Sequence, residues 1–191
     1  MFTEIIIYFY KIFNNLGIAI SLFTLSLKIL TIPLDYLNFK QQKKMEKLNE
    51  KIKEIQKKYK MESKEFTEEI AKFYKQEKVN PFIGIILIVI QFLILAEIYK
   101  SINKISKIES INSFFMGIDL NKPSFYFFIP TLIATFLPLI SIKNIPKFYY
   151  FIFGLVLVVL ATQPSAILLY WFLFNILNFI QNLYFKKYIK N

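Results

Sequence analysis

The sequence predicts an all-α integral membrane protein that crosses the bilayer five times. Its 191 residues are 55% hydrophobic and include 22 phenylalanines, 12 tyrosines and only 4 glycines. Such a composition is typical of a membrane protein rather than of a soluble domain. Five stretches are apolar and long enough to cross a bilayer, which takes about 20 residues of helix. They are Leu16–Tyr36, Pro81–Ser101, Ser124–Ile142, Phe148–Gln163, which is the shortest, and Ser165–Phe185.

The stretch before the first span, FTEIIIYFYKIFNN, is apolar but too short to cross a membrane. It ends at Asn14 and Asn15, and it predicts an amphipathic helix that lies along the membrane surface. The alternative is a signal peptide. A signal peptide usually has a basic start and a cleavage site with small residues, and neither feature is present.

The segment between the first two spans predicts a cytoplasmic helical hairpin. Apolar residues recur at steps of three and four, which is the pattern of a coiled-coil seam. They are Met45, Leu48, Ile52, Ile55 and Tyr59 on the first helix and Phe66, Ile70 and Phe73 on the second. Ser63 is placed to cap the second helix. The segment holds 13 lysines and 8 glutamates, so its surface is basic and suits either a macromolecular partner or anionic lipid headgroups.

The distribution of lysines predicts the topology, because cytoplasmic loops are enriched in basic residues. The hairpin, the loop with Lys143 and Lys147 and the C-terminal tail are basic, whereas the segment 102–123 is only weakly so. We therefore expect the N-terminus outside and the C-terminus in the cytoplasm. The predicted boundaries are 1–15 (interfacial helix), 16–37, 80–102, 124–142, 148–163 and 165–185 (spans), 38–79 (hairpin), 103–123 (extracytoplasmic loop), 143–147 (cytoplasmic loop) and 186–191 (tail).

Lys28 is the most unusual residue, because it falls inside the first span. A cation at the centre of a membrane helix costs about 2.5–3.5 kcal/mol on insertion scales. It belongs to a helical face that carries small and polar residues, namely Gly17, Ser21, Thr24, Lys28, Thr31 and Asp35. Small residues can simply pack helices together, and a long lysine can reach the interface from a helix end. Packing does not account for the lysine, and Lys28 lies only a few residues past the middle of the span.

Other spans carry amides that predict a partner for this face. They are Gln91 in the second span and Asn175, Asn178, Gln181 and Asn182 in the last one, where Trp171 continues the spacing. Each amide taken alone is equally well explained by an interhelical hydrogen bond. Together with Lys28 they predict a shared polar cavity, in which water would keep the lysine charged.

The composition also excludes several kinds of chemistry. The chain has no cysteine and no histidine, which excludes disulfides, thiol catalysis, the usual zinc sites and histidine-based triads. It has no carboxylate pair within the spans and no glycine-rich phosphate loop. We therefore expect no enzyme activity, metal or cofactor. The net charge of +11 could suggest nucleic acid, but the lysines flank the spans, and we expect no DNA partner.

Three segments resemble the conserved core of the YidC/Oxa/Alb membrane protein insertases. They are NLGIAISLFTLSLKILTIPLDYLNFKQQKKMEKLNEKIKEIQKKYK, VNPFIGIILIVIQFLILAEIY and PSAILLYWFLFNILNFIQN. Each motif is modest, but their order and spacing, with the basic hairpin between them, make a strong combined signal. The resemblance implies five helices around a hydrophilic groove that is closed on the outer side. Lys28 stands where the family usually has an arginine; it keeps the charge and lacks the two-pronged guanidinium.

The resemblance further implies a chaperone-like insertase of the bacterial inner membrane. Its partners would be nascent membrane proteins, and the ribosome, the secretion channel and the signal-recognition machinery are further candidates. The expected groove residues are Lys28, Thr24, Ser21, Thr31, Gln91, Asn175, Asn178 and Gln181. The expected cytoplasmic contacts are Lys43, Lys44, Lys47, Lys51, Lys57, Lys58, Lys186 and Lys187.

Three other functions fit parts of the sequence. A small transporter or channel could use Lys28 as an ion site, although such proteins more often show internal repeats or acidic relay residues within their spans. A membrane-anchored scaffold would use the coiled coil and would not need an aligned polar face. A partner-dependent subunit of an insertase complex would need a second protein to complete the groove.

Overall fold

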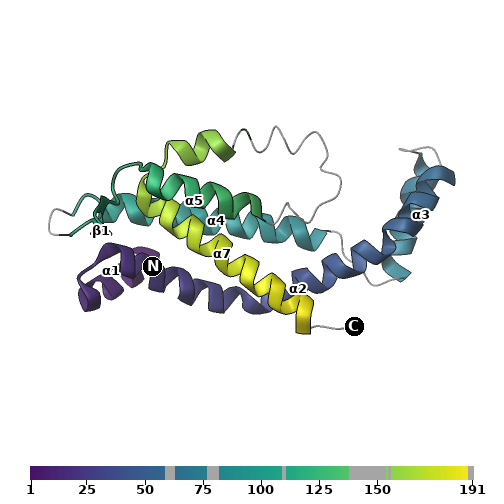
Figure 1. Ribbon diagram of the computed structural model, residues 1–191. Helices are drawn as coiled ribbons and strands as arrows, with labels where there is room; N and C mark the ends of the chain where they lie inside the picture. The colour runs from purple at the N-terminus through teal and green to yellow at the C-terminus, as the bar shows by residue number, and fades with distance from the viewer. Residues whose placement is uncertain (59–62, 77–81, 109–110, 138–153, 155, 189–191) are drawn as a thin grey trace. The chain divides into compact units, whose positions relative to one another are not determined.

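The computed structural model describes residues 1–58, 63–76, 82–108, 111–137, 154 and 156–188 (Figure 1). The chain is mostly helical, as the sequence predicts, and it divides into two compact units. The first unit is Met1–Leu30 with Ile94–Asn191, and the second is Thr31–Leu93. The elements are α1 (Phe2–Phe13), α2 (Leu16–Lys58), α3 (Lys64–Gln76), α4 (Phe82–Ile105), β1 (Phe114–Phe115), β2 (Ile118–Asp119), α5 (Phe125–Phe136) and α7 (Ser165–Tyr188).

Helix α1 corresponds to the expected interfacial helix. It ends at Asn14, which adopts the left-handed conformation (φ 49°) and donates its backbone N–H to the Tyr10 carbonyl at 2.7 Å. Asparagine tolerates this conformation better than most residues. One face of α1 is buried against protein through Ile6 and Tyr10, and the Thr3 hydroxyl donates to the Ser101 hydroxyl of α4 at 3.0 Å. The helix is therefore attached to the first unit by one of its faces.

Helix α2 is a single element of 43 residues. It runs without interruption through the boundary near residue 38 that the sequence predicts between the first span and the hairpin. Pro33 lies inside it. A proline removes one backbone hydrogen bond, which membrane helices tolerate when neighbouring groups satisfy the freed carbonyl. The first span and the first hairpin helix thus belong to one continuous α-helix.

Helix α3 begins as the sequence predicts. The Ser63 hydroxyl accepts a hydrogen bond from the backbone N–H of Phe66 at 3.1 Å, which satisfies one of the free N–H groups of the first turn. The predicted seam would be formed by Tyr59 and by the side chains of Phe73 and of residues 45–55 of α2. The structure does not describe that residue or those side chains. The pairing of the two hairpin helices therefore stays a prediction.

Two helices in the described part of the chain are long and apolar enough to cross a membrane. They are Leu16–Gln41 and Ser165–Tyr188, and Phe125–Phe136 is a shorter apolar helix. The structure does not describe residues 138–153, which include the predicted loop 143–147. It also does not describe most side chains in the first half of α4. Residues 156–161 are helical. The count of five spans stays a prediction.

Helices α5 and α7 lie side by side in the first unit (Figure 1). Thr131 of α5 is fully buried between them. Its hydroxyl is within hydrogen-bond distance of the Phe127 carbonyl of its own helix (2.6 Å) and of the Leu168 carbonyl of α7 (3.0 Å). The second contact links the two helices directly. Buried apolar side chains from α1, α2, α4, α5 and α7 surround this contact in one continuous core.

The segment before α5 folds into a β-hairpin that the sequence does not predict. Phe114 pairs with Asp119 and Phe115 with Ile118, and Met116 and Gly117 form the two-residue turn. Both turn residues have positive φ (53° and 81°), which is what a two-residue hairpin of type I′ requires. Strands this short have no readable alternation, and methionine is not a usual residue for such a turn, which is why the pattern is not visible in the sequence.

Asp119 stabilises the end of this hairpin. Its carboxylate accepts hydrogen bonds from the Ser113 hydroxyl (2.8 Å) and the Asn121 backbone N–H (3.0 Å), and it lies 3.6 Å from the Lys122 ammonium. Partial desolvation raises the pKa of Asp119, but the hydrogen bonds and the lysine charge outweigh it. The pKa of Asp119 therefore lies below its ordinary value of 3.8.

We expect Thr131→Val to lower the free energy of unfolding by about 0.6 kcal/mol, and by no more than ~1.7 kcal/mol, because it removes an interhelical hydrogen bond inside a membrane protein. Denaturation in mixed micelles measures this change. The matched control is Thr135→Val, because the Thr135 hydroxyl bonds only the Thr131 carbonyl of its own helix among the contacts described here. Equal effects of the two substitutions would show that the contact between α5 and α7 contributes nothing.

We also expect Asp119→Asn to destabilise the protein at neutral pH and to lose that effect in acid. The pKa of Asp119 is lower in the folded chain than in the unfolded one, so the stabilisation is complete above 3.8 and disappears as the pH falls through the folded value. The measurement is the difference in Tm between the wild type and Asp119→Asn from pH 7 to pH 3. A difference that stays constant over this range would contradict the assignment.

Candidate functional site

The N-terminal part of α2 presents three of the predicted polar residues on one helical face. Thr24 is fully buried, Lys28 is 4% exposed and Ser21 is half-buried. The Ser21 hydroxyl donates to the Gly17 carbonyl and the Thr24 hydroxyl to the Ile20 carbonyl, both at 2.7 Å. Each hydroxyl proton is thus used within the helix, while the oxygen keeps lone pairs that can accept a hydrogen bond.

Lys28 is held by α7. Its ammonium group donates a hydrogen bond to the Asn178 side-chain carbonyl and lies 5.2 Å from the centre of the Phe174 ring. A charge-assisted hydrogen bond and a cation–π contact both stabilise a cation that is removed from water. The structure therefore brings together Lys28 and Asn178, two of the predicted residues. It adds Phe174, which the sequence reasoning missed although it lies four residues before Asn178 on the same helix.

The other predicted amides of α7 differ in their hydrogen bonding. The Asn175 amide donates to the Trp171 carbonyl of its own helix at 2.8 Å. The Gln181 amide nitrogen is buried and has no hydrogen-bond partner among the described residues. An unsatisfied buried donor costs about 1–3 kcal/mol, which a water or a bound polar group would recover. Gln181 lies one turn beyond Asn178, on the side away from the start of α7.

The remaining predicted groove residues belong to the second unit. The Thr31 hydroxyl lies 3.3 Å from the Asp35 carboxylate, one turn further along α2. Gln91 also falls in the second unit, and its side chain lies outside the described residues. The part of the predicted groove that belongs to the second unit therefore stays a prediction.

The lysines expected to face the cytoplasm are only partly described. Lys43 and Lys44 are half-buried, and the Lys43 ammonium lies 5.0 Å from the centre of the Phe39 ring. Lys186 and Lys187 are exposed in the last turn of α7, where a positive charge is favourable to the helix dipole. The side chains of the other four, Lys47, Lys51, Lys57 and Lys58, lie outside the described residues.

The chemistry available at Lys28 is reversible binding. The buried positive charge and the Gln181 amide, which has no hydrogen-bond partner among the described residues, suit a carboxylate or a peptide carbonyl, whereas the two hydroxyl oxygens can accept from a peptide N–H. The charge is placed on a helix that is long and apolar enough to cross a membrane.

Comparison with known proteins gives consistent matches. Residues 8–191 match the family described as 60Kd inner membrane protein. The chain is 31% identical to a Listeria innocua protein named membrane protein insertase YidC 2, over 98% of this chain and 70% of that protein. It is 28% identical to a Geobacter metallireducens protein named membrane protein insertase YidC, over 95% of this chain and 35% of that protein.

A solved structure described as active YidC insertase, with its first transmembrane domain resolved, is also similar. The TM-score is 0.72 and the identity 25%, and the match covers 100% of this chain and 46% of that one. A Listeria monocytogenes protein named membrane protein insertase YidC 1 is 30% identical, and the match covers 66% of its length. The chain thus spans less than two thirds of several of the proteins that it matches.

We expect Asn178→Leu to lower the free energy of unfolding by about 1.5–3 kcal/mol, because it removes a hydrogen bond to a charged group. Lys28→Met should cost less, since it removes the buried charge together with its desolvation cost. Denaturation in mixed micelles compares the two. The control is Asn182→Leu, an exposed amide one turn further along α7, which should have little effect. A loss for Lys28→Met as large as that for Asn178→Leu would contradict this account.

Proposed function

Because the chain belongs to the 60Kd inner membrane protein family, whose named relatives are YidC insertases, we propose that it is a membrane protein insertase. The family membership confirms the resemblance seen in the motifs. It agrees with a non-catalytic protein of the bacterial inner membrane. The observation that carries the proposal is Lys28, a lysine 4% exposed on a helix long enough to cross the membrane and held by an amide of α7.

The proposed mechanism is physical rather than covalent. A short polar or acidic segment of a nascent protein exchanges water for hydrogen bonds at Lys28, with Thr24, Ser21 and Gln181 near it along α2 and α7. Each polar group so held avoids a desolvation cost of about 2–7 kcal/mol in hydrocarbon. The apolar helix of the same substrate enters the lipid, which supplies about 0.8 kcal/mol for each CH₂ group buried. Burial of the apolar helix thus drives insertion, and the contacts at Lys28 lower its barrier, without a nucleotide.

The finer features of the family are part of the same proposal. We propose five membrane helices around a hydrophilic groove, with Thr31, Gln91 and Asn175 among its lining residues, the N-terminus outside and the C-terminus in the cytoplasm. The basic hairpin and the lysines at the end of α7 then lie where nascent chains emerge. Their positive charge suits ribosomal RNA, and the secretion channel and the signal-recognition machinery are further candidate partners.

We expect proteoliposomes that contain only this protein to insert a single-span substrate with a short acidic outer tail. Lys28→Arg should preserve insertion, whereas Lys28→Gln should reduce it by about tenfold or more, because losing a hydrogen bond to a charged group costs about 1.5–3 kcal/mol. Protection of the tail from added protease measures insertion.

The control is Lys104→Gln, which removes an exposed lysine near the end of α4 and should change nothing. Equal insertion by all variants would remove the role given to the charge and leave the insertase function standing. No insertion by the wild-type protein would overturn the proposal of a self-sufficient insertase and favour a transporter or a subunit that needs a partner.

A further inference from the structure

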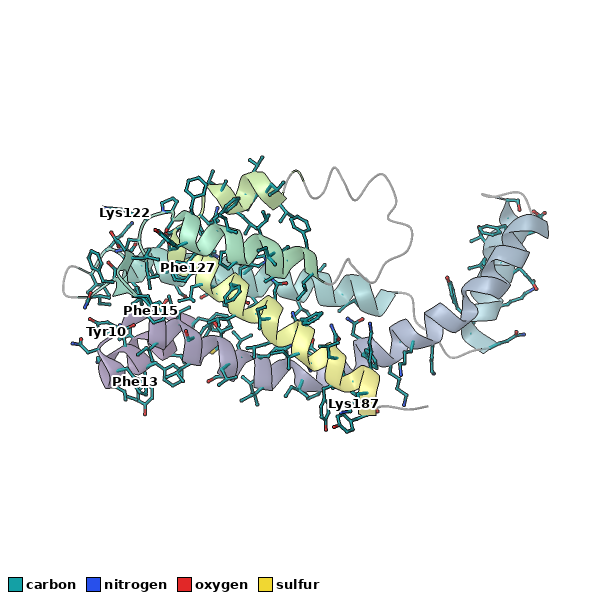
Figure 2. All side chains as sticks on the ribbon, viewed as in Figure 1. Tyr10, Phe13, Phe115, Lys122, Phe127 and Lys187 are labelled. Carbon is teal, nitrogen blue, oxygen red and sulfur yellow. The ribbon has the colours of Figure 1, made fainter. Side chains whose placement is uncertain are left out.

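We infer that the Phe115 ring closes the polar face of α2 at its N-terminal end, by resting directly on Gly17. The inference rests on the proposed function, in which that face is the path of the polar segment. Phe115 lies in the β-hairpin, far from α2 in the sequence. Figure 2 shows it at the same end of the first unit as Tyr10, Lys122 and Phe127.

The contact between Phe115 and Gly17 leaves no room for a side chain. A Cβ atom added at Gly17 would lie 2.1 Å from Cγ and 2.3 Å from Cδ2 of the Phe115 ring. Glycine weakens a helix, so its presence in the first turn of α2 is explained by this close approach. Gly17 is also where the polar face begins, because its carbonyl accepts the hydrogen bond from Ser21. The ring therefore covers the end of the row that leads through Ser21 and Thr24 to Lys28.

The Phe115 ring also packs on α5. The rings of Phe115 and Phe127 are stacked, with centres 6.4 Å apart and planes inclined by 22°. Phe115 is thus wedged between the first turn of α2 and the first turn of α5. Phe114, the preceding residue, points to the other face of the strand pair and is 57% exposed. The two neighbouring phenylalanines therefore have different environments.

The hairpin segment, residues 112–122 around the β-hairpin, is fixed on both sides, which keeps the Phe115 ring in place. Before the hairpin, the Asn112 backbone N–H donates to the Tyr10 hydroxyl of α1 at 2.8 Å. After it, the Leu120 and Lys122 carbonyls accept the N–H groups of Ala166 and Ser165, each at 2.9 Å. These bonds satisfy donors at the start of α7, which a helix cannot satisfy itself. The segment is thus bound to α1 and α7 by hydrogen bonds of its backbone, while its Phe115 ring contacts α2 and α5.

The test uses the absence of cysteine from this chain. Ser21→Cys introduces one thiol at a half-buried position, one turn inward from Gly17. The reagent is a membrane-impermeant maleimide, and the sample is a set of oriented vesicles. Asn121→Cys, at an exposed position after the β-hairpin, identifies the side from which the reagent is added. We expect Ser21→Cys to react slowly, and to react about tenfold faster when Phe115→Ala is added. Phe114→Ala is the matched control and should leave the rate unchanged.

A second variant keeps the test decisive if Phe115→Ala misfolds. Gly17→Ala displaces the ring without altering it, and it should raise the labelling of Ser21→Cys as well. Two results would overturn the inference. One is that Ser21→Cys is labelled equally fast with Phe115→Ala and with Phe114→Ala. The other is that Ser21→Cys alone is labelled as fast as Asn121→Cys. Labelling needs no substrate, so its failure would leave the insertase proposal standing, and a failed insertion assay would not decide whether the ring closes this face.

Discussion

The ammonium group of Lys28 must be stabilised in a mostly apolar part of α2, and side chains of α7 meet this requirement. The Asn178 carbonyl accepts a hydrogen bond from it, and the Phe174 ring offers its electron-rich face. Removing water from a lone charge costs more than most other interactions in a membrane can supply, so such a residue is kept only with partners. The facing surfaces of the two helices are therefore set by chemistry rather than by apolar packing alone.

The other end of α7 decides whether Asn178 reaches Lys28. Ser165 and Ala166 are bound to backbone carbonyls of the hairpin segment, and Asn178 follows 13 residues after Ser165 on the same helix. At 1.5 Å per residue this places it about 20 Å further along. Thr131 adds a lateral link between α5 and α7 near Leu168. The hairpin segment thus sets the register of a helix whose functional residue lies well inside the unit.

The polar side chains of α2 and α7 near Lys28 differ in whether their hydrogen-bonding groups are satisfied within their own helix. The hydroxyls of Ser21 and Thr24 and the amide of Asn175 bond carbonyls of their own helices, so they add polarity at little cost in unsatisfied groups. The Lys28 ammonium is held by Asn178 and Phe174, whereas the buried Gln181 amide nitrogen has no hydrogen-bond partner among the described residues.

Much of this protein can be predicted from the sequence. The apolar stretches predict helices with membrane-spanning length, the step of three and four places Lys28 and Asn178 on polar faces, and Ser63 predicts the start of α3. These are local properties, because helix periodicity and capping depend on residues within a few positions of each other. The quoted motifs also suffice to predict the family.

Only the tertiary structure decides which faces meet and what holds them. No local pattern shows that Phe174 lies over Lys28 or that Gly17 is required by a ring nearly one hundred residues later. Nor does any show that residues 114–119 form a hairpin, or that the Leu120 and Lys122 carbonyls after it bind the start of α7. These contacts depend on how helices pack, and packing is set by the shapes of side chains distant in the sequence. The polar residues themselves are therefore determined by the sequence, whereas the partner of each charge and the closure of the path are determined by the assembled fold.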